Sequence, residues 1–274
     1  RYQCDRVLQE INALVLHLIR NYLLTPEEWL EDPQGLSAMS LVHSLVQPEI
    51  FGVIEPTIFA AIKESYDIQT AFREFVPIPE RIGFLVNRLK RWIALRKMEN
   101  SEKRVAFVLH NNPCKGVEAT VGMAVGMDTF ESLARVLKAM KTEGYDVGDA
   151  PETGKEILDM ILSRKAIAEF RWTTVDEIVR KGGHLHLMDV TEYREFFDTL
   201  DDAVKGKMLR DWEDFPGEGM VFEVEGKPHL VITGLQFGKI KIMAQPKRGC
   251  YGAKCNGEVC RILHDPELSP PHHW

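Results

Sequence analysis

The feature that most constrains the fold is a change of pattern at residue 104. Residues 104–109 form a short apolar run that suits a buried strand, and a loop of about 18 residues, rich in small side chains, follows it. From Asp128 to about Glu143 apolar side chains recur at helical spacing, and Gly144 is placed to end that helix. A strand, a long loop and a helix in this order open a βα unit, so we predict an α/β fold.

The part of the chain before this strand is predicted to be a mainly helical segment, 1–100. Residues 5–24 carry apolar side chains three and four positions apart, which predicts an amphipathic helix. Further helices are expected after the cap at Thr25, over 37–46 and over 79–100. The stretch 47–56 contains two prolines and a glycine, so we expect an ordered loop there.

The part after residue 100 is predicted to be a second, α/β segment, 101–274, which opens with the βα unit as a Rossmann-like region. Residues 152–212 are expected to be mostly helical, with N-caps at Thr153, Thr173 and Thr191. Residues 220–224 and 229–233 alternate around a turn as a hairpin does, and 239–244 suit another strand. The segment is therefore strand-rich towards its end, where a loop rich in His and Cys follows.

Composition excludes some classes of protein. The 34 basic and 41 acidic side chains give a formal charge of −7, which argues against a nucleic-acid binder. The sequence has no apolar run of the roughly 20 residues that a membrane helix needs. The five cysteines favour reduced thiols, and so a cytoplasmic protein. Because the chain begins at Arg1 with a helical pattern already under way, we expect a piece of a longer protein.

Common catalytic and nucleotide-binding motifs are missing from the sequence. Gly116, Gly122 and Gly126 have the wrong spacing for a dinucleotide fingerprint. The stretch from Gly148 to Lys155 is one residue too long for a P-loop, and Glu156 stands where a magnesium-binding hydroxyl belongs. ATP binding by this segment is therefore not expected.

Two loops contain candidate functional side chains. Glu55 stands beside a proline among apolar residues, where desolvation would raise its pKa and make it a better base; the alternative is a surface or capping acid. His110 follows the strand 104–109, and open α/β sheets bind ligands at such strand ends. His110 either ligates or hydrogen-bonds there, or it only packs.

The C-terminal loop gathers metal-binding residue types. Its thiols and first imidazole are four candidate ligands for a structural zinc or cobalt ion, although the spacing lacks a paired knuckle and the thiols could remain free. The paired histidines that follow two prolines are not expected to be core; they are either ligands or a solvated end. These residues are Cys250, Cys255, Cys260 and His264, followed by His272 and His273.

Six stretches together resemble one protein family, the large subunit of ATP-dependent cobaltochelatase and its sister, the magnesium-chelatase H subunit. They occur in the family's order from about residue 24 onward, and the last of them resembles the cobalt enzymes more than the magnesium enzymes. The stretches are 47–56, 77–82, 109–113, 127–132, 144–147, and 245–249 with 264–273.

The resemblance implies a function for the parent protein. Such a ligase inserts Co2+ into the corrin precursor hydrogenobyrinic acid a,c-diamide during cobalamin biosynthesis, while separate AAA+ partner subunits hydrolyse ATP. Glu55 would accept a proton or deliver the metal, and Gln245 and Arg248 would hold substrate carboxylates or amides. His110, His272 and His273 are candidate ligands of the metal that is inserted.

Two alternatives remain open. One is the magnesium branch, in which Mg2+ is inserted into protoporphyrin IX. The other is a non-catalytic module that only binds tetrapyrrole or docks onto another subunit. Members of the family are several times longer than this chain, so we expect the isolated fragment to be inactive and to carry only part of a tetrapyrrole site.

Overall fold

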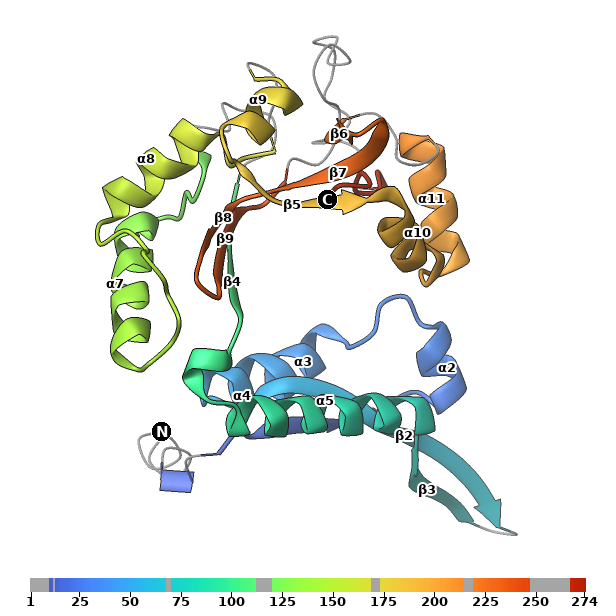
Figure 1. Ribbon diagram of the computed structural model, residues 1–274. Coiled ribbons are helices and arrows are strands. Elements are labelled where there is room, and N and C mark those ends of the chain that lie inside the picture. The colour runs from blue at the N-terminus through green and yellow to red at the C-terminus, as the bar shows by residue number, and fades with distance from the viewer. Residues whose placement is uncertain are drawn as a thin grey trace. The chain divides into compact units, whose positions relative to one another are not determined.

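The computed structural model describes residues 10–11, 13–67, 70–111, 120–168, 173–213, 219–246 and 267–274. The chain divides into two compact units, Arg1–Lys97 and Met98–Trp274. Both units contain helices and strands, which confirms the predicted α/β class (Figure 1). Among the described residues, none of the helices combines the length and the apolar character needed to cross a membrane.

The first unit is built on a three-stranded sheet in the order β1-β2-β3. Strand β1 runs parallel to β2, and β2 runs antiparallel to β3. A small core of Ile19, Ile58, Ala61 and Ile78 lies under this sheet. The elements are β1 (Leu16–Arg20), α2 (Pro26–Glu31), α3 (Ala38–Leu41), a π-helical turn (Val42–Val46), α4 (Gln47–Ile50), β2 (Ile54–Asp67), β3 (Thr70–Pro77) and α5 (Pro79–Lys97).

Two predictions for this unit are wrong. The expected helix over 5–24 is a strand between Leu16 and Arg20, because pairing with β2 along the register Ile19↔Ile58 outweighs the local helical pattern. The expected loop over 47–56 is helical up to Ile50 and extended from Ile54 onward. The segment 1–100 is therefore not mainly helical, since it contains a sheet as well as helices.

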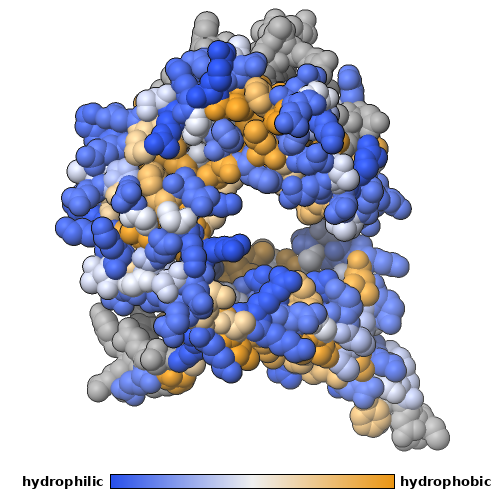
Figure 2. Space-filling view, in the orientation of Figure 1, coloured by the Kyte–Doolittle hydropathy of each residue, from blue (hydrophilic) through white to orange (hydrophobic). Residues whose placement is uncertain are grey.

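Other predictions for the first unit are confirmed. A capping box at Thr25 starts α2, because its hydroxyl accepts from the Glu28 amide at 3.2 Å and the Glu28 carboxylate accepts from the Thr25 amide at 2.8 Å. The helix predicted from Pro79 is α5. Figure 2 shows hydrophobic atoms at the surface of this unit, and its most exposed large apolar side chains include Leu23 and Tyr66.

The second unit begins with the predicted βα arrangement. Strand β4 (Val105–Leu109) pairs in parallel with β9 (Ile240–Ala244), and β9 pairs in antiparallel with β8 (Leu235–Phe237). Helices α7 (Thr129–Thr142) and α8 (Gly154–Arg164) lie on one side of these strands (Figure 1). Ile240 and Ile242 are fully buried in the core between the sheet and these helices. Asp128 caps α7 by accepting from the Glu131 amide at 3.0 Å.

A second sheet in this unit has the order β5-β7-β6. The predicted hairpin is confirmed, with Glu225 and Gly226 at φ 51° and 76° in a two-residue turn that suits the twist of the strands. The predicted mostly helical stretch 152–212 also contains β5, which the sequence pattern did not reveal. The elements are a 3-10 turn (Asn100–Glu102), α9 (Val175–Arg180), β5 (His184–Asp189), α10 (Val190–Asp198), α11 (Asp202–Trp212), β6 (Val221–Val224) and β7 (Lys227–Thr233).

The helix caps in this region agree only in part with prediction. Thr153 caps α8 in a capping box, as expected. Helix α9 is capped by Thr174 instead of Thr173, and α10 is capped by Asp189, whose carboxylate accepts from the Thr191 amide at 2.6 Å. Thr191 is therefore not the N-cap; its amide donates to the N-cap residue Asp189.

Candidate functional site

His110 and Gln245 come from distant parts of the sequence and meet at one edge of a sheet. His110 directly follows β4, and Gln245 directly follows β9. The two strands are parallel, so both residues leave the sheet at its carboxyl edge. The Gln245 amide donates to the Leu109 carbonyl at 2.8 Å and extends the ladder by one residue. The edges where parallel strands end are the usual ligand sites of α/β sheets.

The backbone below His110 is held by hydrogen bonds. The Gly122 amide donates to the His110 carbonyl at 2.7 Å. Asn111 is buried, and its side-chain oxygen accepts from the Thr120 hydroxyl at 3.1 Å. Gly122 has φ 70°, and a Cβ at this position would lie 3.1 Å from the Phe130 ring. The His110 side chain is exposed above this base, so its imidazole is accessible to a ligand.

Glu55 is engaged in an ion pair within the first unit. Its carboxylate accepts from both Nε and Nη2 of Arg88 on α5, with the Nε to Oε2 distance at 2.8 Å. Hydrogen bonding from Arg88, with a smaller contribution from Trp92, lowers the pKa of Glu55 although burial acts in the opposite direction. The expectation that desolvation raises this pKa is therefore wrong, because the guanidinium outweighs the apolar neighbours.

The backbone of Glu55 is unusual. Its φ is 53°, in the left-handed region that non-glycine residues rarely adopt. The Glu55 carbonyl accepts from the Thr57 hydroxyl at 3.2 Å. The carboxylate itself is directed to Arg88 on another element, so among the described contacts it does not cap the segment from Thr57. Strained residues of this kind cluster at functional sites, which keeps Glu55 a candidate.

The paired histidines are buried, in contrast to the expectation that they are not core. The Nε2 of His272 lies 3.2 Å from the Glu213 carbonyl, so this nitrogen carries the proton. Its Nδ1 then accepts from the Tyr193 hydroxyl at 3.0 Å. Both ring nitrogens of His272 therefore have partners within the protein, and ligation of a metal would require that these contacts break. Burial lowers the pKa of His273 to about 3, which keeps this ring neutral.

The segment that carries these histidines packs on α11. The Trp212 indole donates to the Ser269 carbonyl at 2.7 Å. The amide and hydroxyl of Ser269 both lie 2.9 Å from one carboxylate oxygen of Asp211. Leu268 is buried beside them. Residues 267–274 thus form a docked segment, which gives the paired histidines a structural role.

The remaining candidate residues all fall between positions 247 and 266 of the sequence. They lie outside the described residues and are Arg248, Cys250, Cys255, Cys260 and His264. Within the described part of the chain, no three side chains of His, Cys, Asp or Glu are close enough to hold a metal ion. The predicted ligands His110, His272 and His273 therefore form no such group with described neighbours. Their role as ligands stays a prediction.

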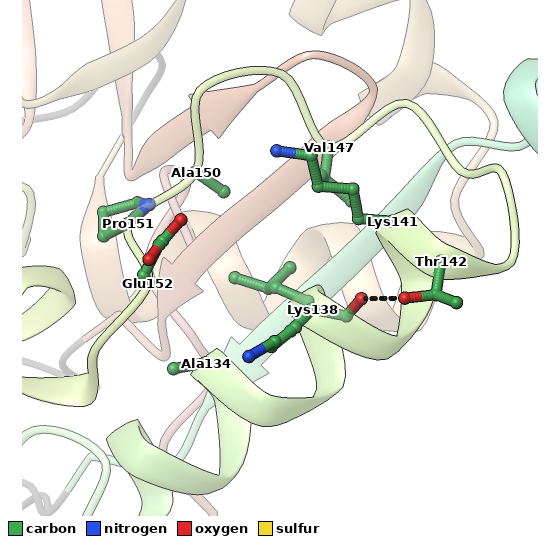
Figure 3. Close-up of a pocket in the computed structure, with 9 residues that line it drawn as sticks. Ala134, Lys138, Lys141, Thr142, Val147, Ala150, Pro151 and Glu152 are labelled. Carbon is green, nitrogen blue, oxygen red and sulfur yellow. Dashed lines mark hydrogen bonds between the residues drawn. The ribbon is translucent and has the colours of Figure 1, made fainter.

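One cavity of about 260 Å³ lies on the helical side of the second unit, between α7 and the segment 147–152 (Figure 3). The residues that line it include apolar Ala134, Leu137 and Val147 and charged Lys138, Lys141 and Glu152. It contains none of the residues that the sequence pointed to.

Two contacts of the candidate residues were not predicted from the sequence, namely Arg88 beside Glu55 and Tyr193 beside His272. Arg88 is 33 positions from Glu55, and Tyr193 is 79 positions from His272. No local pattern predicts such pairs.

Comparison with known proteins gives the relationship of the chain. All of it, residues 1–274, matches the family described as CobN/Magnesium Chelatase. An uncharacterized protein of Methanocaldococcus jannaschii is 46% identical over 272 residues, which are 98% of this chain and 22% of that protein. The aerobic cobaltochelatase subunit CobN of a Sinorhizobium species is 28% identical over 271 residues, 98% of this chain and 20% of that protein.

A solved structure is also similar. The catalytic subunit of cobaltochelatase from Mycobacterium tuberculosis superposes with a TM-score of 0.69 at 26% identity, over 97% of this chain and 20% of that one. The chain therefore spans about a fifth of the length of the relatives that it matches. The match over the full chain, at this level of identity, shows that the chain belongs to the CobN/magnesium chelatase family.

Proposed function

We propose that this chain is part of the large, tetrapyrrole-binding subunit of an ATP-dependent cobaltochelatase. The parent protein would insert Co2+ into hydrogenobyrinic acid a,c-diamide in cobalamin biosynthesis. The observation that carries this proposal is the meeting of His110 and Gln245, which belong to two of the family-like stretches, at the carboxyl edge of β4 and β9. The names of the CobN relative and of the solved structure support it.

Metal insertion sets chemical requirements that this edge can meet. Two pyrrole N–H protons must leave the ring, and the metal ion must lose its water ligands. A neutral imidazole can accept a proton or ligate a divalent metal at neutral pH. The exposed His110 is therefore assigned to one of these tasks. The Gln245 side chain, together with Arg248, would hold carboxylate or amide groups of the substrate.

Glu55 suits metal delivery better than proton transfer. Its lowered pKa keeps the carboxylate charged at neutral pH, and a weakly basic carboxylate is a poor proton acceptor. A charged carboxylate is an oxygen ligand for divalent metal ions, and here ligation would use the lone pairs left by the Arg88 hydrogen bonds or displace Arg88. Arg88 fixes the direction of the carboxylate through two hydrogen bonds and is therefore a positioning residue.

The energy for insertion would come from other subunits. The sequence contains no P-loop, so we propose that AAA+ partner subunits bind and hydrolyse ATP, and that the assembly works in the cytoplasm. A structural zinc or cobalt ion at Cys250, Cys255, Cys260 and His264 remains part of the proposal.

Reconstitution of the full-length protein with its partner subunits tests the function. We expect ATP-dependent insertion of Co2+ into the corrin precursor, which the change in the absorption spectrum measures. Mg2+ insertion into protoporphyrin IX would instead place the protein in the magnesium branch. Binding of tetrapyrrole without insertion of either metal would identify a non-catalytic module.

Variants connect the test to the site. His110→Ala should reduce the rate of insertion at least tenfold. His186→Ala is a matched control, because His186 is an exposed strand histidine of the same unit. Equal rates for the two variants would remove His110 from the proposed site.

A further inference from the structure

A second hollow lies at the opposite end of β4 and β9 from His110 and Gln245. Its volume is about 390 Å³, which is within the range of small-molecule sites. We call it the basic groove, and it is lined by Arg104, Val105, Ala106, Gln236, Gly238, Lys239 and Lys241.

The strand register explains why cationic side chains meet there. Ala106 pairs with Lys241, and Gln236 pairs with the same lysine from the other side. Ile240 and Ile242, which alternate with Lys241 along β9, are fully buried on the core face. Lys241 therefore points to the opposite face, where Ala106 and Gln236 are exposed. Arg104 is one position before β4, so the same alternation places it on this face. Lys239 belongs to the two-residue turn between β8 and β9 and also lines the groove.

The cations of the groove are not paired with any acid that the structure describes. Arg104, Lys239 and Lys241 form no ion pair with a carboxylate in the part of the chain that the structure describes. One acid, Asp146, lies against the groove residue Gly238, and its carboxylate accepts from the Gly148 amide at 3.2 Å. Like charges on neighbouring strands destabilise a sheet. This arrangement occurs in a chain with a formal charge of −7, so it does not follow from a general excess of basic residues.

We propose that the basic groove binds a small polyanion, a molecule that presents phosphate or carboxylate oxygens with at least two negative charges. Arg104 can donate two parallel hydrogen bonds to such a group, and the two lysines supply compact positive charge. The Val105 amide donates to the Lys239 carbonyl at 3.2 Å. This backbone hydrogen bond holds Arg104, the residue before Val105, close to Lys239. The groove lies at the amino ends of the strands, so this site is separate from the one proposed for metal insertion.

A titration of the chain followed by backbone amide NMR tests the proposal. Pyrophosphate and citrate are added in separate arms at low ionic strength, with sodium chloride at matched ionic strength as the reference. We expect saturable shifts of the amides of Val105, Gln236 and Lys241 in at least one arm, and the tighter arm identifies the phosphate or carboxylate class. A tenfold excess over the dissociation constant should also raise the melting temperature of this unit by about 4 °C.

Variants decide whether the groove is responsible. Arg104→Ala and Lys241→Ala should each weaken binding at least tenfold, and Arg104→Lys should weaken it less than Arg104→Ala because it keeps the charge. Lys63→Ala, which removes an exposed strand lysine of the other unit, is the matched control and should bind as the parent chain does. All three positions are exposed, and amide spectra report whether each of the four variants is folded. Shifts no larger than those with chloride, or equal affinity in the groove variants, would overturn the proposal.

Discussion

The hydroxyl group of Tyr193 offers a direct test of the structural role of the docked segment 267–274. Tyr193 and His272 are 5% and 7% exposed, and the hydroxyl lies 3.0 Å from Nδ1 of the imidazole. Burial raises the pKa of Tyr193 to about 12, so the hydroxyl stays protonated and donates a hydrogen bond to the ring. Tyr193→Phe removes this donor and keeps the aromatic ring.

The expected loss follows from the burial of the acceptor. A buried nitrogen that loses its hydrogen-bond donor costs about 1–3 kcal/mol of the free energy of unfolding. In a unit of this size each kcal/mol lowers the melting temperature by roughly 2–4 °C, so we expect a decrease of about 2–12 °C. Thermal unfolding followed by near-ultraviolet circular dichroism measures it.

A second tyrosine of the same unit provides the control. Tyr145 is partly buried, and no hydrogen bond of its hydroxyl is recorded among the described residues. Tyr145→Phe should therefore change the free energy of unfolding by less than about 0.5 kcal/mol. If Tyr193→Phe melts with the parent chain, or only as far below it as Tyr145→Phe does, the inference that His272 serves the docked segment is wrong.

Three further predictions concern activity and pH. In the full-length enzyme with its partners, Glu55→Gln should lower turnover of the folded protein roughly 10²-fold, beyond any decrease in melting temperature from the weakened pair with Arg88. A lower melting temperature with normal turnover of the folded protein would make Glu55 purely structural. The pKa of His273 is about 3 in the folded chain against an ordinary value of about 6.5, so unfolding binds a proton between these values. The free energy of unfolding should therefore reach its full value above about pH 6.5 and decrease as the pH falls towards 3. In His273→Gln this decrease with pH should be smaller. The isolated chain should not hydrolyse ATP, and turnover that disappears in a Lys155 variant would contradict this.

The sequence predicted the elements whose signals are local. Strand β4 and helix α7 follow from the switch between an apolar run and helical spacing, and the structure adds that Asp128 is the cap of the helix. The hairpin of β6 and β7 followed from alternation around Glu225 and Gly226. Each of these signals lies within about fifteen residues, where hydrophobic period and turn chemistry act together.

Elements that depend on distant pairing were not predictable in the same way. Strand β1 carries apolar residues whose spacing also fits a helix, and only its parallel pairing with β2 decides between the two. Strand β5 is similar, since its antiparallel partner β7 lies about forty positions further along the chain. The burial of His272 also depends on distant residues, because Tyr193 and the surface of α11 surround it. The two prolines that precede His272 in the sequence give no sign of this burial.

Glu55 shows how a correct choice of residue can carry a wrong electrostatic argument. Its neighbours Val53, Ile54 and Ile58 are apolar, and on that basis a raised pKa was expected. Arg88, on α5, reverses the direction through two hydrogen bonds to the carboxylate. A charge-assisted pair of this kind depends on where the chain returns in space, which neither composition nor spacing contains. The consequence is specific: the lowered pKa argues against Glu55 as a proton acceptor, because the Arg88 guanidinium stabilises its charged form.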